Sequence, residues 1–196
     1  TAPSQSLLHS GGSAMAEISQ SNSDWKKPML VALKELDGVE GKVGWFPTAV
    51  HPNGTPVALA AAASEFGVPS RSIPPRPFFR PTIAEKNTSW VKLASALAGK
   101  MVEGITTARD AMELLCLQAT SDVKDTIENV RSPKLSDITL VLRKWRREGR
   151  KISGATVGEA ARALKDKTVD ISGVPSDPLN DTGLMIRTLD SVVVQI

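Results

Sequence analysis

The sequence predicts an α+β fold in which a small antiparallel sheet packs against several helices. Two observations favour this class. Stretches typical of strands lie near both ends of the chain, and helical periodicity dominates the region between them. No internal repeat is visible. An extended proline-rich arm and a flexible N-terminal arm complete the expected architecture.

The first half of the chain contains two predicted helices and one predicted strand. Residues 1–24 are rich in Ser, Gly, Ala and Gln and have no sustained period, which is typical of a flexible arm. Helical spacing of apolar residues follows from 25 to 36, and residues 42–46 have the composition of a strand. Residues 56–64 begin with proline and are mostly alanine, which favours a short buried helix over a packed strand.

The second half is mainly helical. Apolar periodicity predicts helices over 82–97 and 106–130, and a third helix that Ser136 caps and Gly149 ends. Thr156 and Glu159 have the spacing of a capping box for a small helix, and the residues from Leu189 onward resemble a closing strand. Residues 25–196 are therefore interpreted as one α+β domain.

Composition limits the classes of function. The 196 residues suffice for one core, but aromatic residues make up only 4% of them, so we expect contacts between subunits to add stability. The net charge of +3 is far below that of a dedicated DNA-binding protein. No apolar run reaches the roughly 20 residues of a membrane span, and no secretory signal is visible, so we expect a soluble intracellular protein without membrane contact.

The residues that commonly bind metals or cofactors are few. The two histidines, His9 and His51, have no second histidine or cysteine at ligand spacing, and no glycine-rich phosphate loop follows a strand. The single cysteine, Cys116, lies in an apolar run and is expected to be buried rather than reactive. We therefore expect no metal, no cofactor and no catalytic residue.

Two motifs have competing interpretations. Asp181-Thr182-Gly183 matches the triplet of aspartic proteases, but such a site needs two aspartates, and a structural turn is the favoured interpretation. The basic run from 143 to 151 surrounds Trp145. It either binds nucleic acid or forms the solvated face of an amphipathic helix, and the second alternative is favoured. The candidates for facing DNA are Arg143, Lys144, Arg146 and Arg147.

The stretch IPPRPFFRP, residues 73–81, is the most unusual feature of the chain. Its prolines fix φ and bias the preceding residues toward extended geometry, so we expect a stiff extended arm rather than a helix interior. The arm contains two adjacent aromatic residues between arginines. If it docks on a neighbouring subunit, proline has already removed conformational freedom that docking would otherwise cost.

Several motifs, taken in order, resemble those of a known family. They are Asn53-Gly54-Thr55, Glu65-Phe66-Gly67, the arm from Pro75 to Pro81, and Leu179 to Gly183. This order resembles the neck or tail-completion proteins of tailed double-stranded DNA bacteriophages, particularly the Mu-like morphogenesis branch. The resemblance spans about 43–194, although residues 99–177 align by helical character alone. The flexible arm is outside the family's pattern.

The resemblance implies a non-enzymatic virion protein, assembled in the host cytoplasm. It implies a subunit that forms a ring, commonly sixfold, at the head-proximal end of the tail, and that completes the tail and joins it to the capsid. Its partners would be copies of itself and neighbouring neck, tail tube or sheath proteins, with non-specific contact to translocating DNA. A DNA-binding protein that uses residues 143–151 is the alternative.

The same resemblance and the arm together suggest site residues. We expect the subunit interface to involve Arg76, Pro77, Phe78, Phe79 and Arg80, with the two phenylalanines as buried anchors. Arg76 or Arg80 is expected to pair with a carboxylate such as Glu65 or Asp181. The alternative is that both phenylalanines pack inside their own subunit. Structural turns are expected at Glu65, Phe66 and Gly67 and at Asp181, Thr182 and Gly183.

Overall fold

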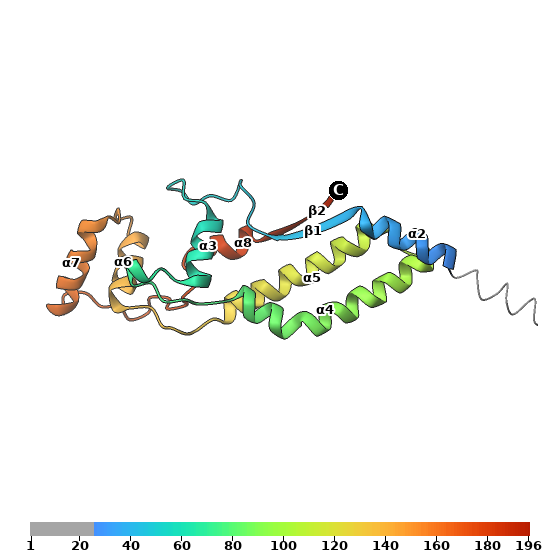
Figure 1. The fold of residues 1–196 in the computed structure, drawn as a ribbon. Coiled ribbons are helices and arrows are strands. Elements are labelled where there is room, and N and C mark those ends of the chain that lie inside the picture. The colour runs from blue at the N-terminus through green and yellow to red at the C-terminus, as the bar shows by residue number, and fades with distance from the viewer. Residues whose placement is uncertain (1–25) are drawn as a thin grey trace, which may run out of the picture. The chain divides into compact units, whose positions relative to one another are not determined.

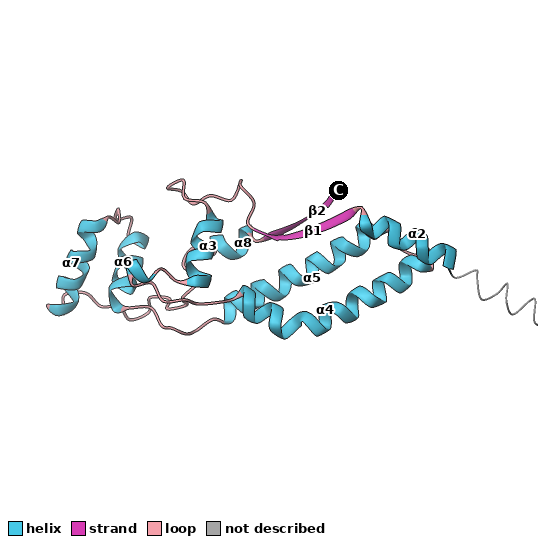
Figure 2. Ribbon diagram, viewed as in Figure 1, coloured by secondary structure: helices cyan, strands magenta, loops and turns pink. Residues whose placement is uncertain are grey.

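The computed structural model describes residues 26–196 (Figure 1). The predicted flexible arm lies outside the described residues, as does Trp25. The elements follow in the order α2 (Lys26–Asp37), β1 (Val39–Gly44), α3 (Val57–Phe66), the short 3-10 helix η1 (Pro69–Arg71), α4 (Phe79–Val102), α5 (Ala108–Asn129), α6 (Asp137–Arg147), α7 (Gly154–Lys165), α8 (Leu184–Thr188) and β2 (Asp190–Gln195). Helices predominate, as Figure 2 shows, and the α+β class is confirmed.

The sheet consists of the two strands nearest the ends of the described chain, β1 and β2, which pair with each other. The N–H of Ile196 donates to the carbonyl of Gly38 at 3.0 Å beside this pair. β1 begins and ends earlier than the predicted strand over 42–46. The reason is that Trp45 leaves the strand and donates from Nε1 to the Met185 carbonyl at 2.8 Å.

The described chain divides into two compact units. Among the described residues, unit 1 contains 26–42, 89–116 and 192–196, and unit 2 contains 43–88 and 117–191. Both strands, α4 and α5 contribute residues to each unit. None of the helices within 26–196 is long and apolar enough to cross a membrane.

Unit 1 has a core of small and flexible apolar side chains from α2, α4 and α5. Its buried members are Ala32, Leu97, Met101, Ala108 and Ala111. Gly41 of β1 lies so close to α5 that a Cβ there would collide with the Sγ of Cys116. Cys116 is buried, as predicted, and burial, followed by the charge of Glu113, raises the pKa of its thiol.

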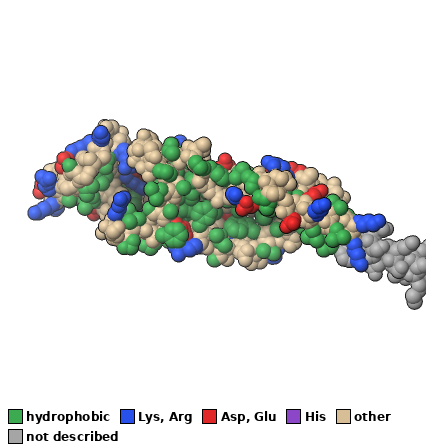
Figure 3. All heavy atoms as spheres, turned by 45° about the horizontal axis from the view of Figure 1, so that its top comes forward, with side chains coloured by type: hydrophobic (Ala, Val, Ile, Leu, Met, Phe, Trp, Pro, Cys, Tyr) green, Lys and Arg blue, Asp and Glu red, His purple; other side chains and the backbone are tan. Residues whose placement is uncertain are grey.

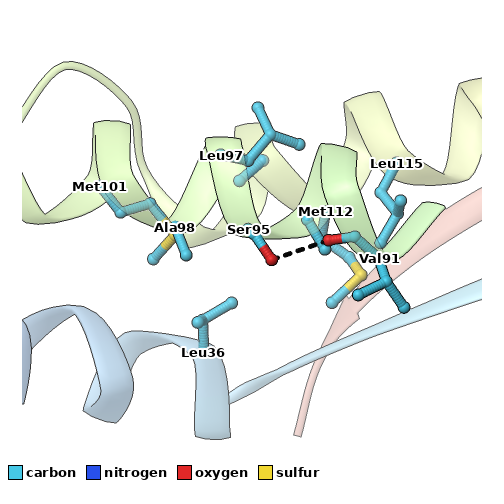
Figure 4. A pocket seen from close by; sticks show the side chains of 10 residues that line it. Leu36, Val91, Ser95, Leu97, Ala98, Met101, Met112 and Leu115 are labelled. Carbon is cyan, nitrogen blue, oxygen red and sulfur yellow. Dashed lines mark hydrogen bonds between the residues drawn. The ribbon is translucent and has the colours of Figure 1, made fainter. Parts of the chain in front are cut away.

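An apolar groove of about 350 Å³ lies among the same three helices (Figure 4). Leu36 of α2 faces it from one side, and Val91, Ala98 and Met101 of α4 line it with Met112 of α5. The other lining residues are Ala94, Ser95, Leu97, Ala111 and Leu115. Although Leu97 and Met101 are buried, the side chain of Val91 is exposed.

Unit 2 has the larger aromatic core. Phe78, Ile127, Leu189, Val57 and Val123 are almost completely buried, together with Ala61 and Met185. α3 is a helix rather than a strand, as favoured from the sequence, and it begins at Val57 with Pro56 as its cap. Its buried side chains lie four residues apart, at Val57, Ala61 and Glu65, so one face of the helix meets the core.

α5 starts and ends near the predicted residues, whereas α4 is longer than predicted at both ends and reaches Val102 where the prediction stopped at Leu97. α4 begins at Phe79 and not at Thr82, so that Pro81 lies in its first turn. Proline is tolerated there because the first N–H groups of a helix have no partner within the helix. Residues 74–77, which precede α4, have no regular secondary structure.

α6 and α7 are held by local caps. Ser136 caps α6, as predicted, because its hydroxyl accepts from the Thr139 N–H at 3.3 Å. The capping box of α7 uses Ser153 and Thr156, where the sequence predicted Thr156 and Glu159. Glu159 instead forms an ion pair with Arg150.

Candidate functional site

The Glu65 carboxylate connects the end of α3 to the beginning of α4 within unit 2. Its Oε2 accepts hydrogen bonds from the N–H groups of Phe78 at 2.6 Å and Phe79 at 3.0 Å. Its Oε1 accepts from the Arg80 N–H at 3.2 Å. Pro81, the next residue, has no N–H to satisfy. One side chain, remote in sequence, therefore accepts from the N–H of Phe78, just before α4, and from the N–H groups of the first two residues of α4.

Glu65 is buried and remains charged. Its side chain is only 5% exposed, and the guanidinium Nε of Arg80 lies 2.9 Å from its Oε1. Burial by itself would raise the pKa of this carboxyl, but the hydrogen bond from the Phe78 backbone and those from the side chain of Arg80 and the backbone of Phe79 and Arg80 outweigh it and lower the pKa. The carboxylate is thus suited to structural support rather than to proton transfer.

A turn was predicted at Glu65, Phe66 and Gly67, but Glu65 and Phe66 are the last two residues of α3, and the turn begins at Gly67, where glycine is required. Gly67 has φ of 73°, and a Cβ there would lie 2.8 Å from the Pro75 nitrogen and 2.9 Å from the Ile73 carbonyl oxygen. Val68 and Ile73 form an antiparallel bridge just beyond it. This tight approach lays the chain that enters the arm directly against the end of α3.

Phe78 lies inside its own subunit. It is 0% exposed and belongs to the core of unit 2, where its ring meets Trp45 edge-on at a centroid distance of 5.8 Å. Phe79 also meets Trp45 edge-on, at 5.7 Å, and is half-buried. Phe78 consequently has no ring surface left for a neighbouring subunit, in contrast to the anchor role predicted for it.

Arg76 is likewise used within its own chain. Its Nε donates to the Pro133 carbonyl at 2.7 Å and its Nη2 to the Lys134 carbonyl at 3.1 Å. Burial lowers the pKa of this guanidinium. The side chain therefore fastens the arm to the segment between α5 and α6, and it is 8% exposed where an interface contact was predicted.

Three neighbouring residues of this cluster are exposed: Pro77, Arg80 and, most prominently, Phe66, which is 65% exposed. The Arg80 guanidinium carbon lies 5.1 Å from the centre of the Phe66 ring, in cation–π geometry. Because Arg80 also binds Glu65, this aromatic side chain lies at the end of α3, where Glu65 and Arg80 connect α3 to the start of α4. We call Phe66 and Arg80 the Phe66 face.

Asp181 is surrounded by arginines from α6. Its carboxylate oxygens lie 3.5 Å from Nε of Arg143, 2.5 Å from Nη1 of Arg146 and 3.8 Å from Nη2 of Arg147. Thr182 and Gly183 continue the bend, and Gly183, with φ of 69°, leads into α8. This triplet therefore lies in a turn that is cross-linked to α6 by ion pairs.

The basic run of 143–151 is largely engaged in contacts within the chain. Arg143 is buried and donates to the carbonyls of Pro175 and Asp177, both at 2.9 Å. Lys144 donates to the Asp170 carbonyl at 2.8 Å, and Arg150 stacks over Trp145 at 4.1 Å. Figure 3 shows Lys and Arg side chains at the end of the picture where Figure 1 labels α6 and α7, and the exposed charges there include Arg146 and Arg147.

Sequence reasoning identified the residues of this cluster but missed two of its connections. It named Glu65 as a partner for Arg80 but not as the cap of α4, and it did not assign Trp45 to the aromatic core. A short polar residue just before a helix is the usual sequence signal for a cap, and Glu65 lies 13 residues before Phe78.

Within 26–196, no group of three His, Cys, Asp or Glu side chains is arranged to hold a metal ion. No family model matches the chain, and neither does any curated protein or solved structure.

Proposed function

We propose that this chain is a structural subunit of a bacteriophage neck or tail, and that it assembles into a ring at the head-proximal end of the tail. In this role it completes the tail and joins it to the capsid. The resemblance of its ordered motifs to tail-completion proteins supports the proposal. So does the way in which these motifs meet: Glu65 caps the helix that begins in the arm, and Trp45 links Phe78 to the α8 backbone at Met185.

The observation that carries the proposal is the Phe66 face. An aromatic side chain that is 65% exposed is costly to leave in water, and here it is fixed by the Glu65 cap, by Gly67 and by Arg80. Aromatic residues and arginine are enriched among the residues that dominate binding energy at protein interfaces. A rigid pair of this kind loses little conformational entropy on docking, which favours assembly with an identical neighbour.

The interface proposed from the structure is therefore shifted relative to the sequence prediction. Pro77 and Arg80 remain interface candidates, whereas Phe66 takes the place of Phe78 as the aromatic anchor. Partners beyond the ring would be neighbouring neck, tail tube or sheath proteins. The virion is the proposed location, with assembly in the host cytoplasm.

DNA binding by α6 is the second candidate function, favoured by the half-exposed side chains of Arg146 and Arg147. Both arginines already pair with Asp181, and Arg143 is buried, so phosphates would have to compete with an existing carboxylate. The number of charges free for DNA is consequently small, and the salt dependence of any DNA affinity is expected to be shallow.

Light scattering coupled to size exclusion tests the proposal against this alternative. The ring proposal expects one discrete oligomer whose formation depends on protein concentration and not on DNA. A protein that stays a monomer without DNA, and whose affinity for duplex DNA falls steeply as salt is raised rather than shallowly as expected above, would favour DNA binding instead.

A further inference from the structure

The groove of unit 1 is an apolar surface that the described residues leave uncovered. Leu36, Val91 and Met112 line it, and Val91 is 57% exposed there. Figure 4 shows Leu36 and Met101 directed into the same space from α2 and α4. A groove of about 350 Å³ formed by apolar side chains from three helices has the size and chemistry to take several aliphatic side chains.

A second hollow of about 200 Å³ extends this surface along α2. It is lined by Met29 and Leu33 and shares Leu36 and Ala98 with the groove. Met29, Leu33 and Leu36 follow one another at helical spacing, and Leu33 is 51% exposed. An apolar path therefore runs from near the start of α2 to the groove.

The chain that precedes α2 has apolar side chains for this path. Within residues 1–25 the large aliphatic ones are Leu7, Leu8, Met15 and Ile18. Lys26 lies eight positions after Ile18, and the chain between them spans up to about 26–29 Å when extended. From Lys26 to Leu36, α2 rises by only about 15 Å. The segment can therefore turn back along α2 and reach the groove.

The charges of the segment and of the groove walls are complementary. Residues 1–25 carry Glu17 and Asp24 and contain no Lys or Arg. The three helical stretches that line the path, 26–37, 89–102 and 108–116, carry six basic and four acidic residues, a net charge of +2: Lys26, Lys27, Lys34, Lys92, Lys100, Arg109, Glu35, Asp37, Asp110 and Glu113. Opposite charges around an apolar contact favour its formation and its orientation.

We infer that residues 7–18 of this chain bind in the apolar groove of unit 1 of the same molecule. Attachment through 19–25 holds the segment near the groove at a high effective concentration, so binding within one molecule is favoured over binding between molecules. Leu7, Leu8, Met15 and Ile18 occupy the groove and the hollow beside Leu33. This inference concerns unit 1 and is independent of the Phe66 face in unit 2.

Disulfide trapping in the full-length chain tests the inference. In a Cys116→Ser background, Leu8→Cys, Met15→Cys or Ile18→Cys is combined with Ser95→Cys, which lies on the groove, and each double variant is oxidised. The matched controls combine the same three changes with Ala96→Cys, because Ala96 is exposed on the neighbouring position of α4 and does not line the groove.

We expect at least one Ser95→Cys pair to give an internal disulfide, at least fivefold more than its Ala96→Cys control. The product migrates as a monomer on a non-reducing gel, and peptide mass mapping identifies the bond. Equal disulfide yields with Ser95→Cys and with Ala96→Cys would overturn the inference. A product of twice the monomer mass would also overturn it, because the segment in the groove would then belong to a second copy of the chain. Circular dichroism of each reduced variant verifies that the helices are intact.

Discussion

The carboxylate of Glu65 lies 2.6 Å from the backbone nitrogen of Phe78, although the two residues belong to different elements. This contact begins α4 and turns Phe78 into the core. It also places Arg80 where it binds Glu65 and covers the ring of Phe66. The position of the exposed Phe66 ring in the proposed interface thus depends on the buried carboxylate of Glu65, the preceding residue.

Glu65→Gln is expected to lower the free energy of unfolding by about 2 kcal/mol. The amide keeps one acceptor, but its NH₂ group faces N–H donors, and the attraction to Arg80 and to the start of the helix is lost. Urea denaturation measures the change. The control is Glu85→Gln, whose side chain is 72% exposed and is expected to change stability by less than about 0.5 kcal/mol. Equal effects of the two substitutions would contradict the cap.

The stability conferred by Glu65 is expected to depend on pH. Because the pKa of this carboxyl is lower in the folded state than the 4.5 of an unperturbed glutamate, the unfolded chain binds the proton first as the pH falls. The stabilisation is complete above about pH 4.5 and is lost as the pH falls through the folded-state pKa. The gap in unfolding free energy between wild type and Glu65→Gln should therefore narrow below pH 4.5. A gap of constant size from pH 7 to pH 3 would refute this assignment.

Gly67→Ala is expected to destabilise unit 2 by at least about 2 kcal/mol, through the positive φ and through the clash with Pro75 and Ile73. Gly54→Ala is the matched control, because Gly54 has φ of 80° and open space around its Cβ position. Gly54→Ala should lower the free energy of unfolding by only about 1 kcal/mol, because only the positive φ is unfavourable there. Thermal unfolding separates the two effects, and similar melting temperatures for both variants would argue against the close approach.

Asp181→Asn is expected to cost about 2 kcal/mol of stability, since Arg143 is buried and would lose its carboxylate partner. The variant should also bind DNA more tightly at low salt, because Arg146 and Arg147 are released. Asp177→Asn serves as the control, as its pair with Arg131 is exposed and contributes about 0–1 kcal/mol. If wild type cleaved peptides and Asp181→Asn abolished the cleavage, the turn would have to be reinterpreted as a protease site.

Phe66→Ala is expected to leave the monomer folded and to raise the concentration needed for half-assembly by at least about tenfold. Val157→Ala removes a side chain of α7 that is 43% exposed, and it should leave assembly unchanged. Light scattering over a dilution series measures both. Unaltered assembly of Phe66→Ala, with its helix content intact, would exclude the Phe66 face as the subunit interface.

The local features of the fold were predictable from the sequence. The Ser136 cap, the burial of Cys116 and the helix at 57–66 each follow from neighbouring residues, through capping, apolar periodicity and propensity. The α+β class required only the positions of the strand-like stretches near both ends.

The features that depend on distant partners were not predictable. Which of the two adjacent phenylalanines faces the core is decided by where α4 begins, and Glu65 decides that. Arg76 and Arg143 are buried because they donate to backbone carbonyls of loops. Every residue has a backbone carbonyl, so the sequence does not indicate which carbonyls these arginines will bind. The sequence therefore predicted that the arm at 73–81 docks on a neighbouring subunit. In the structure, Arg76 and Phe78 make their contacts within their own subunit.

Negative-stain imaging of the purified wild-type chain, at a concentration where light scattering gives a constant mass, tests the central proposal most directly. The account predicts closed rings of a single rotational symmetry, with six subunits as the number that the resemblance implies, and their loss in Phe66→Ala. Particles of monomer size at every concentration, with no rings in the images, would contradict it.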